Sequence, residues 1–287
     1  MRRSSAFVAA SVVLFARALV GCASPETDPV ASEGAAIVQG EVLFYPSGKP
    51  VDASELVDLG PPESLGGTVL KGDPHISARI DFSDGVLLAG VFQATRGKVQ
   101  IHFPFTEHAT ISYGEVAITD ETGQSRVFHP GDSYLIRQGS TVVWDVKCDR
   151  VQKSFLNRVE AEDRPGPMLV YPRGSVVPAA DLVDLGPPEA LGGTVISGDP
   201  HIAARIDDVH EGLFGGVFQA SRGEVLVHYP FTEHAAITRW TVDLTGSDGE
   251  TISMHPGDAY LILQGSPVLW QVAPLRVQKS FLNYTYP

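Results

Sequence analysis

The chain has 287 residues, of which 43% are hydrophobic, and its formal net charge is −13. This length and composition are typical of two globular domains with packed cores. The acidic charge excludes a protein that follows nucleic-acid phosphates, so no nucleic-acid partner is expected. Its two cysteines, Cys22 and Cys148, form no Cys/His zinc pattern.

The first residues resemble a bacterial lipoprotein signal peptide. Arg2 and Arg3 precede an apolar stretch, residues 6–20, which is too short to span a membrane. That stretch ends in Leu19-Val20-Gly21-Cys22. This motif is similar to the lipobox, where the signal peptide is cut and the cysteine receives a lipid.

The resemblance implies a lipid-anchored protein of the bacterial cell envelope. We expect residues 1–21 to be the signal peptide, residues 22–41 a flexible tether, and Cys22 the point of attachment to the membrane. Ala23 follows the cysteine, where signals for retention in the inner membrane usually have aspartate. An outer-membrane lipoprotein is therefore the expected localisation.

The rest of the chain is an internal duplication with a constant offset of 126 residues. Glu107 corresponds to Glu233 and Trp144 to Trp270, with no insertion or deletion between the two copies. A repeat of this length indicates two copies of a whole domain rather than a short-period solenoid. We place the first domain at residues 42–158, a charged and proline-rich linker at 159–168, and the second domain at 169–287.

Each copy consists of short apolar runs of strand length that are separated by Gly, Pro and Asp. No amphipathic helix of useful length is predicted. Many short strands with hairpin turns predict an all-β fold, either an antiparallel sandwich or a barrel. In the first copy the predicted strands are residues 87–95, 98–103, 108–113, 115–119, 125–128, 134–137, 142–146 and 151–156.

Motifs within the copies resemble those of the cupin superfamily. Glu107 followed by Gly114 fits half of cupin motif one, and Gly131 and Gly139 fit the two glycines of motif two. The sequences of both copies resemble those of the cupin subfamily that includes (S)-ureidoglycine aminohydrolase and the ethanolamine-utilisation cupins. The resemblance implies two tandem antiparallel jelly-roll (cupin) barrels, a bicupin, each with a ligand cavity at its mouth.

Most well-known cupins bind a divalent metal through two His and one Glu of motif one and a His of motif two. In this sequence only the carboxylates, Glu107 and Glu233, occupy their expected places. Apolar or aromatic residues stand at the imidazole positions, namely Ile101, Phe103 and Val142 in the first copy and Val227, Tyr229 and Val268 in the second.

Strand alternation agrees with that loss. It places Ile101 and Phe103 in the interior and turns His102 away from it. Since a metal needs three or more converging donors, no cofactor is expected. The alternative is a Mn, Fe or Zn site in which His102 reaches Glu107, or to which His75 or His129 contributes from a loop.

A lysine on the last strand suggests what fills the cavity. Val151 and Phe155 face inward by alternation, and Lys153 shares their face. A buried lysine must be paired or have a shifted pKa, so we predict an ion pair with Glu107. The alternative is a lysine that extends to the rim and pairs at the surface. The predicted ligand pocket comprises Glu107, Lys153, Phe103, Trp144 and Phe92 in the first copy and Glu233, Lys279, Tyr229, Trp270 and Phe218 in the second.

Three functions follow from these features. The first is a lipid-anchored envelope bicupin that binds a small polar metabolite without metal. The second is a cupin enzyme, a hydrolase or aminohydrolase acting on a small ureido or amino compound; without metal, Glu107 and Lys153 would supply its acid–base chemistry. The third is a structural scaffold. The two domains are also candidates for packing as an intramolecular pseudo-dimer.

The two copies differ at one motif position. Arg239-Trp240 replaces Tyr113-Gly114, so the motif-one glycine is absent from the second copy. We therefore expect the mouths of the two barrels to have different shapes.

Overall fold

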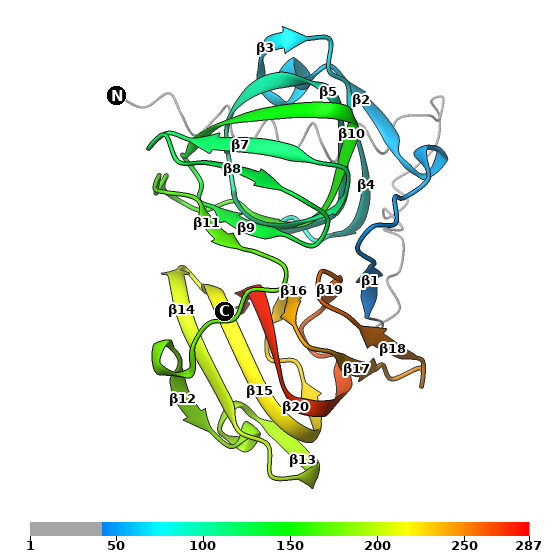
Figure 1. The fold of residues 1–287 in the computed structure, drawn as a ribbon, viewed down its shortest axis with the longest axis vertical. Coiled ribbons are helices and arrows are strands. Elements are labelled where there is room, and N and C mark those ends of the chain that lie inside the picture. Colours follow the sequence, from blue (N-terminus) through cyan, green and yellow to red (C-terminus); the bar gives the residue numbers. More distant parts are fainter. Residues whose placement is uncertain (1–41, 287) are drawn as a thin grey trace, which may run out of the picture.

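The computed structural model describes residues 42–286, so the predicted signal peptide, lipobox and tether lie outside the described residues. Within that range the chain forms 20 β-strands and four short 3₁₀ helices, with no α-helix. Figure 1 shows two barrels, one above the other. None of the described helices has the length and apolarity that crossing a membrane requires.

The first barrel is a ten-stranded antiparallel sheet whose main path runs β11-β9-β6-β10-β5-β4-β2. Its strands are β2 (Val57–Gly60), β3 (Thr68–Gly72), β4 (Ile76–Ser83), β5 (Leu87–His102), β6 (Thr106–Tyr113), β7 (Val116–Asp120), β8 (Ser125–Phe128), β9 (Ser133–Ile136), β10 (Thr141–Arg158) and β11 (Leu169–Tyr171). Two 3₁₀ helices, η1 (Ala53–Glu55) and η2 (Pro62–Leu65), flank β2.

The second barrel repeats this plan, with the main path β1-β19-β16-β20-β15-β14-β12. Its strands are β1 (Leu43–Tyr45), β12 (Val183–Gly186), β13 (Gly193–Gly198), β14 (Ile202–His210), β15 (Leu213–His228), β16 (Thr232–Arg239), β17 (Val242–Thr245), β18 (Thr251–Met254), β19 (Ala259–Ile262) and β20 (Pro267–Tyr284). Its 3₁₀ helices are η3 (Ala179–Asp181) and η4 (Pro188–Leu191). The predicted fold class, all-β with two tandem antiparallel jelly-roll barrels, is confirmed.

Two long strands bend each sheet into a barrel. β5 and β10 pair along their whole length, with a register shift between Val146 and Arg150. Such a bulge kinks a strand pair and increases its twist. Consequently the first part of β10 pairs with β7 and the second part with β6. β4 pairs with β5, and at Gly90 the two strands are so close that a Cβ would lie 2.0 Å from the Arg79 carbonyl oxygen, so only glycine is accommodated there.

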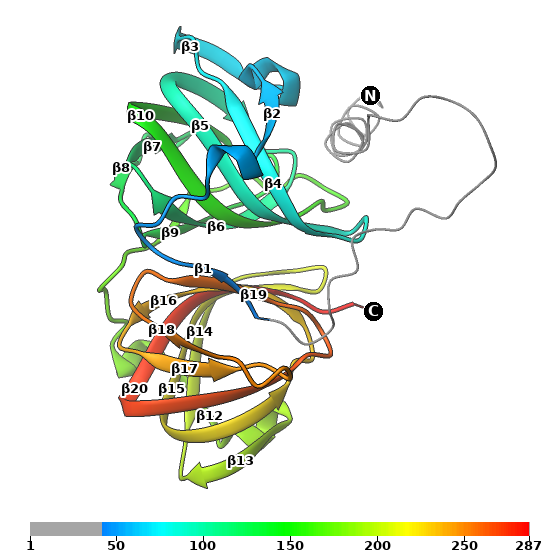
Figure 2. The ribbon, with the colours of Figure 1, turned by 90° about the vertical axis from the view of Figure 1, so that its right-hand side faces the viewer.

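Each barrel takes one edge strand from the other copy of the sequence. β1 precedes the first barrel in the chain but pairs with β19 of the second, joining Leu43 to Leu261 and Tyr45 to Ala259. β11 pairs in the same way with β9 of the first barrel. Figure 2 shows β1 lying against β19. The predicted domain boundaries follow the sequence repeat, whereas the hydrogen-bonded sheets cross those boundaries at β1 and β11.

The two Pro-Gly-Asp turns hold these exchanged strands. Asp258 Oδ1 accepts a hydrogen bond from the Ser47 amide just after β1, at 2.8 Å, and Asp132 Oδ1 accepts one from the Arg173 amide, at 2.9 Å. Gly131 and Gly257 have φ angles of +95° and +101° and meet each other between the barrels. A Cβ on Gly131 would lie 2.6 Å from the Gly257 Cα, so both the backbone conformation and the close approach require glycine.

A shared apolar layer joins the barrels, with a histidine pair among its residues. The layer contains Leu87, Leu135 and Leu156 from the first barrel and their counterparts from the second. His108 Nδ1 lies 2.8 Å from His234 Nδ1. Burial lowers the pKa of His108 to about 3. Burial, together with His108, lowers the pKa of His234 well below its usual value, so both rings are neutral. His108 alternates with the inward-facing Glu107 and Ala109, so it lies on the outer face of its own barrel, where this face packs against the second barrel.

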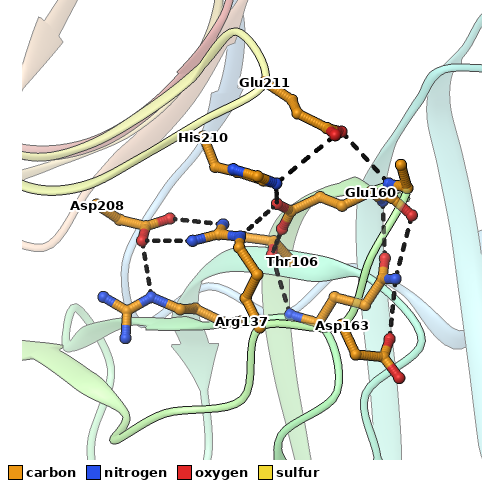
Figure 3. Close-up of polar contacts among 10 residues, drawn as sticks. Thr106, Arg137, Glu160, Asp163, Asp208, His210 and Glu211 are labelled. Atoms are coloured by element: carbon orange, nitrogen blue, oxygen red, sulfur yellow. Dashed lines mark hydrogen bonds and ion pairs between the residues drawn. The ribbon is translucent and has the colours of Figure 1, made fainter.

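The segment between the copies is held by charged contacts (Figure 3). Arg164 donates to both oxygens of Asp208 on β14, each at 3.1 Å, and to Glu160 at 2.7 Å. Arg137, which follows β9, also donates to Asp208, at 2.7 Å. Burial alone would raise the pKa of Asp208, but the hydrogen bonds from Arg164 and Arg137 lower it below its usual range. This cluster has no equivalent in the first copy, where Phe82 stands in place of Asp208.

Candidate functional site

A cavity of about 290 Å³ lies inside the first barrel. Its wall is mostly apolar and includes Leu65, Ile76 and Ile101, and its charged groups are Glu107 and Lys153. All five pocket residues predicted for the first copy line this cavity, namely Phe92, Phe103, Glu107, Trp144 and Lys153.

A buried ion pair forms the polar part of the wall. Lys153 Nζ on β10 lies 2.5 Å from Glu107 Oε1 on β6, and the two residues are 5% and 2% exposed. Lys153 therefore points into the barrel, as strand alternation predicts, and does not pair at the rim. Trp144 and Phe92 present their rings to the ammonium, with centroids 4.9 Å and 5.2 Å from Nζ, an arrangement that stabilises a cation.

Tyr134 completes the cluster and was not part of the predicted pocket. Its hydroxyl donates to Glu107 Oε1 at 2.9 Å and accepts from Lys153 Nζ at 3.1 Å. Because Tyr134 begins a predicted strand whose other inward residue is Ile136, alternation places its ring inside. A buried tyrosine hydroxyl needs a polar partner, and that requirement is the signal that identifies it.

Burial and the Glu107 charge have opposite effects on the pKa of Lys153 and the same effect on the pKa of Tyr134. Burial lowers the pKa of the Lys153 ammonium, and the neighbouring Glu107 opposes that shift without cancelling it. Burial and the Glu107 charge both raise the pKa of Tyr134 well above its usual value. Tyr134 therefore keeps its proton and donates a hydrogen bond to the carboxylate.

The second barrel contains the same cluster. Lys279 Nζ lies 2.5 Å from Glu233 Oε1 and 2.8 Å from the Tyr260 hydroxyl, which itself donates to Glu233 at 2.7 Å. Trp270 and Phe218 again face the ammonium, at 4.7 Å and 5.1 Å. The remaining predicted residue, Tyr229, is also buried within this barrel.

The residues present do not fit the metal site that cupin motifs imply. Ile101, Phe103 and Val142, which stand at the imidazole positions, pack in the apolar interior. The remaining carboxylate is engaged by an ammonium group, so a cation placed there would meet Lys153 at close range. In residues 42–286, no three His, Cys, Asp or Glu side chains are grouped as metal ligands would be.

The histidines considered as alternative ligands do not converge on Glu107. His102 and His75 are exposed. His129 is also exposed, and its ring lies 3.2 Å from Glu115 at the surface. The structure thus brings together the predicted glutamate, lysine and aromatic residues and leaves these three histidines outside the cavity.

Comparison with known proteins identifies the domain type. Residues 83–155 match the family model described as the EutQ-like cupin domain. A solved structure of a protein of unknown function from Pseudomonas syringae pv. tomato has 23% identity and a TM-score of 0.66, with 85% of this chain and 100% of that chain covered.

A second solved structure has the same architecture. It is a protein from Pseudomonas aeruginosa described as glyoxylate-induced, with 10% identity and a TM-score of 0.50, and 92% of this chain and 95% of that chain are covered. No curated protein matches the sequence. At these identities the similarity shows the fold and not the activity. Residues 83–155 are therefore similar to the EutQ-like cupin domain, and the two barrels together have the fold of a tandem cupin.

Proposed function

We propose that the first barrel binds a small molecule whose polar group meets Glu107 and Lys153 and whose body contacts the apolar wall. The observation that supports this proposal most directly is the cavity of about 290 Å³ that includes a buried ion pair in its wall. Ligand pockets are commonly apolar clefts of this order of size, with a few converging polar groups that fix the orientation of the ligand.

The lysine retains a donor for such a ligand. An ammonium group has three N–H donors, and Lys153 directs two of them to Glu107 and Tyr134. The third is available for an oxygen or nitrogen of a bound molecule. Because Glu107 and Tyr134 both hold the ammonium, this donor has a fixed position, which lowers the entropic cost of binding.

We propose further that binding needs no divalent metal. Lys153 supplies the positive charge next to the carboxylate, where a metal-dependent cupin has its cation. Metal analysis of the purified protein tests this point. Stoichiometric Mn, Fe, Zn or Ni that survives dialysis would contradict it.

The binding proposal is tested by a matched pair of double variants. Glu107→Gln/Lys153→Met removes both charges of the buried ion pair in the first barrel with little change in volume. Glu233→Gln/Lys279→Met does the same for the ion pair in the second barrel. Small metabolites that raise the melting temperature of the wild-type protein are identified by a thermal-shift screen. We expect the first double variant to lose this shift and the second to keep it. Retention of the shift in both variants would exclude the first-barrel ion pair as the recognition element.

A second candidate is an acid–base enzyme that acts on a small amino or ureido compound. It is favoured by the lowered pKa of Lys153 within a cavity, since catalytic lysines are commonly prepared in this way. The same double variants separate the two candidates, because turnover of a bound compound by wild-type protein, absent in Glu107→Gln/Lys153→Met, would establish catalysis.

We also propose that the protein is lipidated at Cys22 and anchored in the bacterial envelope, in the outer membrane. Support comes from the lipobox Leu19-Val20-Gly21-Cys22 and from Ala23. The tether of residues 22–41 would hold the two barrels away from the bilayer.

A further inference from the structure

One interior position differs between the two otherwise matching clusters. Phe103 in the first barrel corresponds to Tyr229 in the second. Both side chains are 3% exposed, so the exchange places one additional oxygen in the interior of the second barrel. A buried hydroxyl must have polar neighbours, and those neighbours show what the first barrel lacks.

The Tyr229 hydroxyl is a partner for the indole of Trp270. Trp270 Nε1 donates to it at 3.0 Å. Burial, followed by the charge of Glu233, raises the pKa of Tyr229 well above its usual value, which places the hydroxyl within the field of that carboxylate. The Tyr229 hydroxyl therefore accepts the hydrogen bond of Trp270, whose ring lies next to the Glu233–Lys279 ion pair.

Trp144 has the same position in the first barrel but has no such acceptor. Its ring centroid lies 6.2 Å from the ring centroid of Tyr134 and 4.9 Å from Lys153 Nζ. The Trp270 centroid lies 6.2 Å from the ring centroid of Tyr260 and 4.7 Å from Lys279 Nζ. The indole therefore has the same placement in both barrels. Trp144 is 4% exposed and lines the cavity, and its Nε1 has no hydrogen-bond partner among residues 42–286.

We infer that the ligand of the first barrel carries an uncharged hydroxyl group, which lies beyond the Phe103 ring and accepts a hydrogen bond from Trp144 Nε1, as the Tyr229 hydroxyl does from Trp270 in the second barrel. This inference rests on the proposed binding function and names the ligand class. A hydroxyl group suits the place because it accepts from the indole and also has a proton to donate toward the Glu107 carboxylate. A carboxylate ligand lacks that proton and would face Glu107 as a like charge.

In the second barrel the Tyr229 hydroxyl already accepts the hydrogen bond from Trp270 Nε1, so we assign recognition of the ligand hydroxyl to the first barrel. Asn157 and Asn283 do not distinguish the barrels, because the Oδ1 atoms of both lack partners in the described part of the chain. The distinction depends on the exchange of Phe103 for Tyr229 alone.

Indole NMR signals test this inference in the full chain, because the protein has only three tryptophans. The protein is labelled with ¹⁵N at tryptophan and titrated with phenol, and with toluene as a probe of similar shape that lacks the hydroxyl. Trp144→Phe assigns the signal. We expect phenol to move the Trp144 signal downfield without moving that of Trp270, and toluene to bind roughly tenfold more weakly.

The reciprocal variants Phe103→Tyr and Tyr229→Phe provide the decisive comparison. Phe103→Tyr should shift the Trp144 signal toward that of Trp270 without any ligand and should abolish the response to phenol. Tyr229→Phe should leave the Trp144 response unchanged. Urea unfolding checks that Phe103→Tyr is folded, which we expect because the second barrel accommodates the same side chain.

Two results overturn the inference and are distinguishable from failure of the binding proposal. If Phe103→Tyr leaves the Trp144 signal or its phenol response unchanged, no hydroxyl site exists at the indole. If toluene binds as tightly as phenol, the cavity binds apolar molecules but does not recognise a hydroxyl group. If neither probe affects Trp144, the binding proposal itself fails.

Discussion

Replacement of Lys153 by methionine should destabilise the protein, because it leaves the Glu107 carboxylate buried without its cation. The two groups are 2.5 Å apart and almost fully buried. Loss of one partner of a buried pair costs about 3–5 kcal/mol. The hydrogen bond from Tyr134, at 2.9 Å, remains and offsets about 1 kcal/mol of that cost. We therefore expect the free energy of unfolding to fall by about 2–4 kcal/mol.

A double-mutant cycle separates the ion pair from simple packing. Glu107→Gln alone leaves a buried ammonium group and should also destabilise the protein by several kcal/mol, on the order of 3. The double variant Glu107→Gln/Lys153→Met has no unpaired charge, so it should cost less than the sum of the single changes by about 2 kcal/mol or more. Urea unfolding followed by circular dichroism measures all four proteins under the same conditions.

Additivity would refute this reasoning. If the cost of the double variant equals the sum of the two single costs within about 0.5 kcal/mol, the charges are not coupled in the folded protein. The corresponding cycle at Glu233 and Lys279 should give a similar coupling energy, because the distances in the second barrel are nearly the same.

Three further outcomes are expected. Burial lowers the pKa of His108 to about 3, below its value in the unfolded chain. Its contribution to stability should therefore fall by about 1.4 kcal/mol per pH unit as the pH drops below about 6.5. In urea unfolding at pH 7 and pH 5, the free energy of unfolding of His108→Gln should depend less on pH than that of the exposed control His102→Gln. Asp208→Ala should destabilise the protein by about 2–3 kcal/mol in urea because it removes the acceptor shared by Arg137 and Arg164, whereas exposed Asp199→Ala should change stability by less than about 0.5 kcal/mol. Cys22→Ala should abolish incorporation of labelled palmitate and move the protein from the membrane to the soluble fraction, and unchanged labelling would contradict the predicted lipobox.

Alternation along short strands was sufficient to predict the interior of each barrel. It placed Ile101 and Phe103 in the interior and turned His102 away from it; the structure confirms this, because Ile101 and Phe103 line the cavity and His102 is exposed. The predicted strands 87–95 and 98–103 are parts of the single strand β5. Likewise 142–146 and 151–156 both lie in β10, because a bulged strand changes register without ending.

Other features depend on contacts between residues far apart in the chain. β1 is only three residues long, and nothing in Leu43–Tyr45 indicates which sheet it joins. Its partner is determined by the Asp258 side chain and by the close contact of Gly131 with Gly257, across more than 100 residues of chain. β4 (Ile76–Ser83) was not predicted, although its sequence alternates between apolar and polar residues.

The unpaired indole of Trp144 was also beyond sequence reasoning, although both residues that create it were in the predicted pocket. The exchange of Phe103 for Tyr229 is visible in the repeat as the loss of one hydroxyl. Its consequence depends on the distance from Tyr229 to Trp270 Nε1, which follows from the curvature of the barrel and not from spacing along the chain.

The exchanged strands explain how one barrel can retain an unpaired buried donor. Such a donor costs about 1–3 kcal/mol, a substantial part of the stability of a single small domain. Here the first barrel does not stand alone, since β11 completes its sheet and the layer around Leu135 and Leu156 packs it against the second barrel. Tyr229 meanwhile satisfies the corresponding indole in the second barrel. Duplication thus allows the second copy to stabilise a shared structure, while the interior of the first copy keeps a donor that no residue of the described chain accepts and that a bound molecule can use.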